Sequence, residues 1–188
     1  MKNTMRLLSG ILVAGSLFVG ACQDSQNSKK IAEDQNEEKF DTKAAEKDAQ
    51  FVVDVAAANY TEIEYAQAAL QKSGNQEIKD LATTLEADHR MFLSQLKAYA
   101  STHNISTPDS ASADVQKSAM DMKEDKSAAE FDKKWCDELT DMHEKTIKKL
   151  EDASNEVSDP DLKTWIADAL PKIRTHRDKL MECKNKLK

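Results

Sequence analysis

The chain has 188 residues and a formal net charge of −7, from 34 acidic and 27 basic side chains. That length allows one folded domain with a leader and a linker, and not two full domains. Lys and Arg are interleaved with Asp and Glu and form no basic stripe, which argues against nucleic-acid binding. With only four Gly and three Pro, and with abundant Ala, Lys, Glu, Asp and Leu, the composition predicts an all-α domain.

The first 22 residues have the pattern of an export signal. Lys2 and Arg6 supply positive charge, an apolar run of about 13 residues begins at Leu7, and small residues precede Cys22. This pattern resembles the lipobox of bacterial lipoproteins, in which the cysteine is acylated and the peptide before it is removed. We therefore expect a signal peptide over residues 1–21 and a lipid on Cys22. The alternatives are a plain secretory signal and a single transmembrane anchor, although the run is too short to span a bilayer comfortably.

The next stretch, residues 22–47, is polar and poor in large apolar side chains. Such a composition cannot bury enough surface to offset the entropy of folding, so it predicts a flexible linker before a domain over residues 48–188. Gln23 follows the cysteine, where enterobacterial lipoproteins kept in the inner membrane commonly have Asp. We expect a protein of the bacterial cell envelope that is held to a membrane, in a diderm the outer membrane, by its lipid.

Apolar residues at three- and four-residue spacing predict two helices in the first half of the domain. The first covers residues 48–73 and ends at Gly74, which we expect in the left-handed conformation. The second begins after Asn75, a good N-cap, and runs to Thr102, with Asn104 as its stop. The short turn between them predicts a helical hairpin.

A long connection follows, rich in Ser and Ala, with a short helix expected over residues 114–124. The third long helix begins with the capping box of Ser127 and Glu130. The fourth begins at Asp159-Pro160, and Pro171 within it predicts a kink. Two hairpins joined by a long middle connection predict a ferritin-like four-helix bundle, with a simple up-down bundle as the alternative.

Short segments in a fixed order resemble an uncharacterised bacterial family, catalogued as domain of unknown function 4142. The segments are Phe51-Val52-Val53, Thr61-Glu62-Ile63-Glu64, Asp88-His89, Ala129-Glu130-Phe131-Asp132, His143-Glu144-Lys145, Asp159-Pro160-Asp161-Leu162-Lys163, Leu170-Pro171 and His176. The resemblance covers residues 48–183. It implies exported proteins with a ferritin-like fold and implies no reaction.

Three of the four histidines fall on the inward stripes of three different predicted helices. Imidazole and carboxylate groups are ligands of zinc and iron, so this pattern indicates a divalent-metal site inside the bundle. The candidate ligands are Glu62, Glu86, Asp88, His89, His143 and His176. The alternative is a set of core polar residues that hydrogen-bond across helices, for instance Glu62 with His89.

The expected helix register brings one pair of candidate ligands together and keeps another pair apart. Glu62 lies within about one turn of His89, but His143 and His176 are about 9 Å apart along the bundle axis. Ile173 stands where a second Glu-x-x-His motif would have its carboxylate. That absence argues against a di-iron centre and leaves a mononuclear zinc or similar site.

Cys136 and Cys183 are the thiols that remain besides Cys22. An even number in an exported chain favours a disulfide, although the expected register places the two about one and a half turns apart. Two buried free thiols are the alternative.

No Gly-rich phosphate loop and no nucleophile elbow is present in the sequence. The sequence therefore favours a non-enzymatic envelope lipoprotein whose bundle binds a partner protein or a small ligand, with no established cofactor. A His-rich, ferritin-like protein that binds a divalent metal is the alternative.

Overall fold

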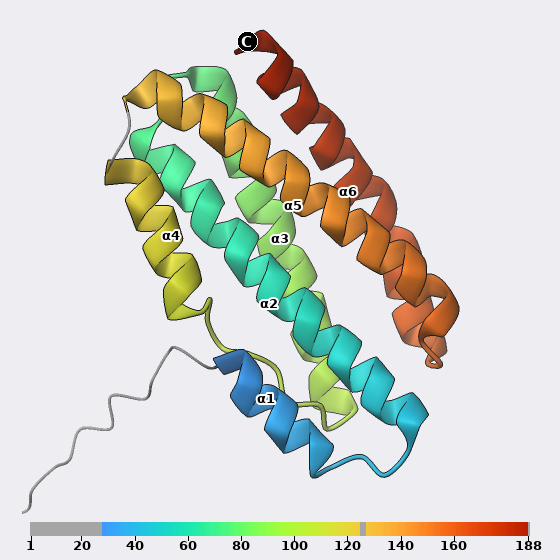
Figure 1. The fold of residues 1–188 in the computed structure, drawn as a ribbon. Coiled ribbons are helices and arrows are strands. Elements are labelled where there is room, and N and C mark those ends of the chain that lie inside the picture. The colour runs from blue at the N-terminus through green and yellow to red at the C-terminus, as the bar shows by residue number, and fades with distance from the viewer. Residues whose placement is uncertain (1–27, 125–126, 188) are drawn as a thin grey trace, which may run out of the picture.

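A computed structural model describes residues 28–124 and 127–187, so the expected signal peptide and Cys22 lie outside the described residues. The described part is all-helical, which confirms the predicted fold class. Its helices are α1 (Ser28–Glu37), α2 (Lys43–Lys72), α3 (Gln76–Thr102), α4 (Ala113–Glu124), α5 (Ala128–Glu156) and α6 (Pro160–Lys186). The four long helices lie side by side as a bundle (Figure 1). Within these residues, no helix is both long and apolar enough to cross a membrane.

The bundle consists of two antiparallel hairpins, α2–α3 and α5–α6, that pack against each other. The start of α5 meets the end of α2, where Trp135 Nε1 donates to the Tyr65 carbonyl oxygen at 2.8 Å. The end of α5 meets the start of α2, where Lys149 Nζ lies 2.7 Å from Asp54 Oδ2. The chain between α3 and α5 must therefore return along the whole bundle, and α4 lies against α2 on this path (Figure 1). One long crossover between two hairpins is the connectivity that was expected.

Most helix ends follow the predicted caps. Asn75 Oδ1 accepts from the Glu77 amide at 2.9 Å, and the capping box of Ser127 and Glu130 is complete. Asp159 caps α6 ahead of Pro160, and the helix continues through Pro171 to Lys186. These side chains satisfy amides that have no partner within the helix.

The end of α2 differs from the prediction at Gly74. Among the described glycines none has a positive φ, so the left-handed conformation expected there is wrong. Ser73 instead turns the chain with an extended backbone, at φ −64° and ψ 137°, and its hydroxyl accepts from the Asn75 amide at 3.0 Å. Asn104, the expected stop of α3, does have a positive φ of 56°.

Residues 28–47 differ from the flexible linker that their composition suggested. α1 packs against α2, which itself begins at Lys43. The buried amide of Asn36 donates to the Ser106 carbonyl oxygen at 2.9 Å and accepts from the Ser106 amide at 2.7 Å. One large apolar side chain of the segment, Phe40, packs partly buried against the core. A small buried residue, Ala32, and a two-way amide contact fix α1 to the loop after α3.

The core of the described residues has two large apolar clusters and a small one of Ala56, Ile63 and Leu93, with a polar layer between the two large ones. One cluster includes Val52, Phe92 and Ile166, and the other includes Leu85 and Trp135. Between them, near the middle of each long helix, lie the buried polar residues Asn59, Glu62, His89, Thr140, His143 and His176. A polar layer at mid-height is costly unless every group in it has a partner.

A disulfide joins α5 to α6 through Cys136 and Cys183, whose Cα atoms are 6.1 Å apart. The turn between these helices is centred near Ser158, because α5 ends at Glu156 and α6 begins at Pro160. That centre is about two residues later than the sequence suggested, which brings Cys136 opposite residue 180 or so and within about one turn of Cys183.

Candidate metal centre

Each of the four long helices supplies one residue to the centre of the polar layer. These residues are Glu62 from α2, His89 from α3, His143 from α5 and His176 from α6. Their side chains are at most 3% exposed. One nitrogen from each of the three imidazole rings lies within 4.8 Å of the others.

The protonation of His89 follows from its neighbour Asn59. The Asn59 amide nitrogen donates to the Val55 carbonyl oxygen at 2.8 Å, so the Asn59 oxygen must accept, and it does so from His89 Nδ1 at 2.9 Å. Nε2 is then the nitrogen of His89 that is free to bind a ligand. It lies 2.7 Å from Glu62 Oε2 and 3.4 Å from His143 Nε2.

The other two histidines are oriented in the same manner. His143 Nδ1 donates to the Leu139 carbonyl oxygen at 2.9 Å, which leaves its Nε2 with a lone pair facing His89. His176 Nε2 donates to Asp88 Oδ2 at 2.9 Å, and its Nδ1 is buried without a hydrogen-bond partner. Each ring is thus held through one nitrogen and turns the other towards the cluster, which is the arrangement of metal-binding histidines and their supporting acceptors.

Charge in the layer favours a cation. Burial raises the pKa of Glu62, but the facing His89 and His143 outweigh this effect and lower the pKa to about 2, so the carboxylate is ionised. Burial lowers the pKa of His143, and lowers the pKa of His176 to about 4 against the opposing hydrogen bond to Asp88. Neutral imidazoles and an ionised carboxylate are the forms that bind metal ions. A proton on His89 Nε2 makes its contact with Glu62 a charge-assisted bond, and a metal ion can take that place.

One nitrogen–nitrogen distance in the cluster can be compared with known coordination geometries. With metal–nitrogen bonds of about 2.0–2.1 Å, two tetrahedral ligands are about 3.3–3.4 Å apart, whereas adjacent octahedral ligands are about 2.9 Å apart. The 3.4 Å between His89 Nε2 and His143 Nε2 fits the tetrahedral value. The contact of 2.7 Å between Glu62 and His89 must open by several tenths of an ångström to receive an ion.

The structure brings three of the six predicted ligands, His89, His143 and His176, into one cluster, with Glu62 against it at 2.7 Å from His89 Nε2, and it separates the other two from the centre. Asp88 supports His176 from outside the cluster. Glu86 points away and pairs with Arg90 at 2.7 Å and with Gln67 at 2.9 Å. The predicted 9 Å separation of His143 and His176 is wrong, because the later α5–α6 turn shifts the facing position; their ring centroids are 5.6 Å apart.

Sequence reasoning missed the roles of Asn59 and Thr146. Thr146 Oγ1 donates to Glu62 Oε1 at 3.3 Å, and Asn59 orients His89. Both lie on inward helix stripes that are otherwise apolar. A polar residue at such a position was the sequence signal that could have indicated their roles. His103, the fourth histidine, lies apart at the end of α3, where it stacks on Tyr99 with ring centroids 3.9 Å apart.

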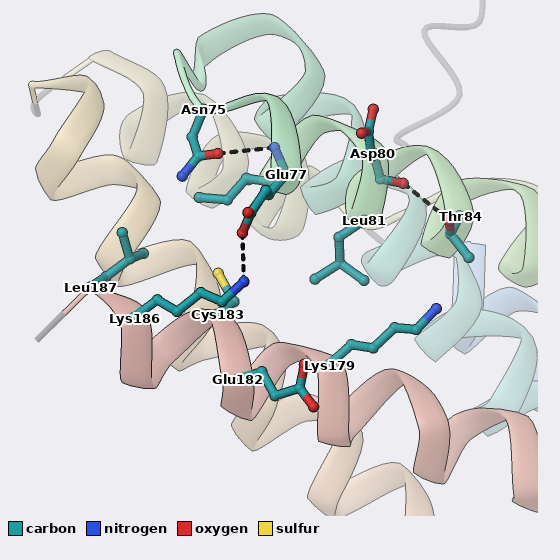
Figure 2. Close-up of a pocket in the computed structure, with 11 residues that line it drawn as sticks. Asn75, Glu77, Asp80, Leu81, Thr84, Lys179, Glu182, Cys183, Lys186 and Leu187 are labelled. Carbon is teal, nitrogen blue, oxygen red and sulfur yellow. Dashed lines mark hydrogen bonds and ion pairs between the residues drawn. The ribbon is translucent and has the colours of Figure 1, made fainter.

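A groove of about 370 Å³ opens between the start of α3 and the end of α6 (Figure 2). Its lining includes Leu81, Thr84, Lys179 and Cys183, and Lys186 Nζ bridges its rim to Glu77 Oε2 at 2.7 Å. None of the clustered histidines lines it. The histidine cluster is therefore internal and does not lie at the floor of this groove.

Comparison with known proteins identifies a family but no characterised relative. The model of the family described as "Domain of unknown function (DUF4142)" matches residues 33–182. Comparisons with curated proteins and with solved structures gave no significant match. The match spans most of the chain, including α2, α3, α5, most of α6 and the polar layer. The chain belongs to the DUF4142 family.

Proposed function

We propose that the bundle holds one divalent transition-metal ion among Glu62, His89, His143 and His176. The observation that carries this proposal is the unpartnered, buried Nδ1 of His176 beside two other imidazole nitrogens whose lone pairs face inward. Burying a nitrogen without a hydrogen-bond partner lowers the free energy of unfolding by about 1–3 kcal/mol. A bound metal ion would be the missing partner.

The alternative is a purely structural hydrogen-bond network. It accounts for the contact between Glu62 and His89, which needs only a proton. It does not account for His176 Nδ1, which is buried without a hydrogen-bond partner. A metal ion would give that nitrogen a partner, so the metal explains more of the geometry.

The donor set indicates the class of ion and its use. Three imidazoles and one carboxylate, with no thiolate or thioether, suit zinc and the divalent ions of iron, nickel and copper. The tetrahedral spacing favours zinc. Four protein ligands complete a tetrahedral shell and leave no position for a substrate, so the site is suited to holding an ion and not to catalysis. A single carboxylate in the layer is too few to bridge two irons.

Metal analysis of the purified protein tests this proposal. Wild-type protein loaded with Zn²⁺ and then desalted should retain about one equivalent by mass spectrometry, and His143→Ala should retain almost none. His103→Ala is the matched control, because His103 is outside the cluster, and it should retain the wild-type amount. Circular dichroism establishes that each variant is helical. Equal retention by His143→Ala and wild type would contradict the proposal.

We also propose that the protein is a lipid-anchored protein of the cell envelope. The proposal rests on the pattern of residues 1–22 and is supported by the disulfide, since such bonds persist in oxidising compartments. Metabolic labelling with palmitate tests it: the wild type should be labelled and Cys22→Ser should not. Labelling of the variant would mean that another residue carries the lipid, and an unlabelled wild type would mean that none does.

A further inference from the structure

A partly exposed carboxylate, that of Asp88, is hydrogen-bonded to the buried cluster. Asp88 accepts from His176 Nε2 at 2.9 Å, and its side chain is 27% exposed, whereas the four proposed ligands are almost fully buried. Asp88 therefore joins the polar layer to solvent at the contact between α3 and α6. A carboxylate in such a position attracts cations and can replace part of their hydration shell.

A lysine lies beside this carboxylate. Lys172 Nζ on α6 is 3.8 Å from Asp88 Oδ1 and 5.9 Å from the centre of the Phe92 ring, with half of its side chain exposed. The groove of Figure 2 follows the same helix contact and reaches Thr84, about one turn before Asp88 on α3. The positive charge of Lys172 thus stands next to the carboxylate and opposes the approach of a cation.

We propose that metal ions reach the centre between α3 and α6 by way of Asp88, and that the charge of Lys172 limits the rate of their passage. This inference rests on the proposed metal site and adds its route of access. In this arrangement an ion first exchanges water for the Asp88 carboxylate. It then passes to the inner ligands when the His176 ring moves aside.

The competing route lies on the opposite side of the bundle, between α2 and α5. There the partly buried Thr146 hydrogen-bonds to Glu62, and Lys145 beside it is exposed. Thr146 is neutral, so it offers a cation less attraction than Asp88 does. This second route supplies a matched control, since Lys145 and Lys172 carry the same charge beside the two alternative openings.

Stopped-flow mixing of the metal-free protein with Co²⁺, whose visible absorption reports tetrahedral binding, measures the rate of uptake. Lys172→Gln should bind Co²⁺ about tenfold faster than wild type at low salt, and this difference should shrink at high salt. Release into excess EDTA should accelerate by a similar factor, so that the Kd changes by less than about threefold. Lys145→Gln should resemble wild type in both rates, and Asp88→Asn should take up Co²⁺ about tenfold more slowly.

Each other outcome overturns the proposal in a recognisable way. Faster uptake by Lys145→Gln alone would place the route beside Thr146. Equal rates for all variants would show that Asp88 and Lys172 have no part in access. A tighter Kd for Lys172→Gln with an unchanged rate of uptake would mean that the lysine acts on the bound ion. If wild type gives no Co²⁺ absorption at all, the metal site itself is absent, and the proposed function fails with it.

Discussion

The two ring nitrogens of His176 have different surroundings, and this difference fixes which nitrogen faces the cluster. Nε2 donates to Asp88, while Nδ1 is buried without a partner. Asn59 and the Leu139 carbonyl oxygen impose the same asymmetry on His89 and His143. Three rings with one outward donor and one inward lone pair form a cluster that accepts cations and repels anions. The charge of Glu62 adds to this preference.

The carboxylate of Glu62 should matter far more than that of Glu86. Glu62→Gln removes the one negative charge among the proposed ligands, and we expect Zn²⁺ affinity to fall at least about a hundredfold. Glu86→Gln is the same change on an outward-facing residue, and it should bind Zn²⁺ as wild type does. Competition with a chromophoric chelator measures both. Equal affinities for the two variants would remove Glu62 from the ligand set.

The metal-free protein should lose stability as the pH falls from 6.5 towards 4. The pKa of His176 is lowered from 6.5 to about 4 by burial, so below pH 6.5 the unfolded chain takes up a proton that the folded chain cannot. The free energy of unfolding should fall by up to about 3 kcal/mol over this interval. Urea unfolding in EDTA at pH 7 and pH 4.5 measures it. His176→Gln should show a smaller pH dependence, and an unchanged one would assign the effect to other groups.

Helix ends were largely predictable because caps are local, whereas the register between helices was not. The Asn75, Ser127 and Asp159 caps all lie where the sequence placed them. Facing positions on α5 and α6 depend on the turn centre, and a shift of two residues there moves the facing residue by four, about 6 Å along the axis. The prediction from the sequence therefore placed His143 too far from His176.

The disulfide between α5 and α6 should contribute strongly to stability. It closes a loop with a sequence separation of 47, for which chain entropy predicts about 4 kcal/mol. Thermal unfolding should show a lower midpoint for wild type in dithiothreitol than in its absence. A Cys136→Ser, Cys183→Ser double variant is the control, because its midpoint should be low and insensitive to dithiothreitol. An equal wild-type midpoint with and without dithiothreitol would mean that the disulfide does not contribute to thermal stability.

Across the whole molecule, composition predicted the helical class but not where the folded part begins. Residues 28–47 contain only Ile31 and Phe40 as large apolar side chains, and the sequence argument counted only residues of that kind. α1 is fixed instead by the Asn36 amide, which pairs with the backbone of Ser106, 70 residues away in the chain. A polar contact over such a sequence distance has no local pattern, so it could not be read from the sequence.

Limited proteolysis should reveal this larger folded unit. Trypsin should cut slowly at Lys43 and Lys47, because these residues belong to α2 in the folded protein. The stable fragment should therefore retain α1. Asn36→Leu removes both hydrogen bonds to Ser106 and should expose these sites to rapid cleavage while the four-helix bundle remains helical. Rapid cleavage at Lys43 in the wild type would show that α1 is not held in solution.

If Cys22 carries a lipid, the position of α1 would set how far the bundle can stand from a membrane. The described helices begin at Ser28, six residues after Cys22. At about 3.3–3.6 Å per residue, even a fully extended chain of that length reaches about 20 Å. A lipid on Cys22 would then keep the bundle close to the bilayer surface, where it diffuses in two dimensions. Its metal ions and its protein partners would have to come to that surface, since the chain is too short to carry the site across the envelope.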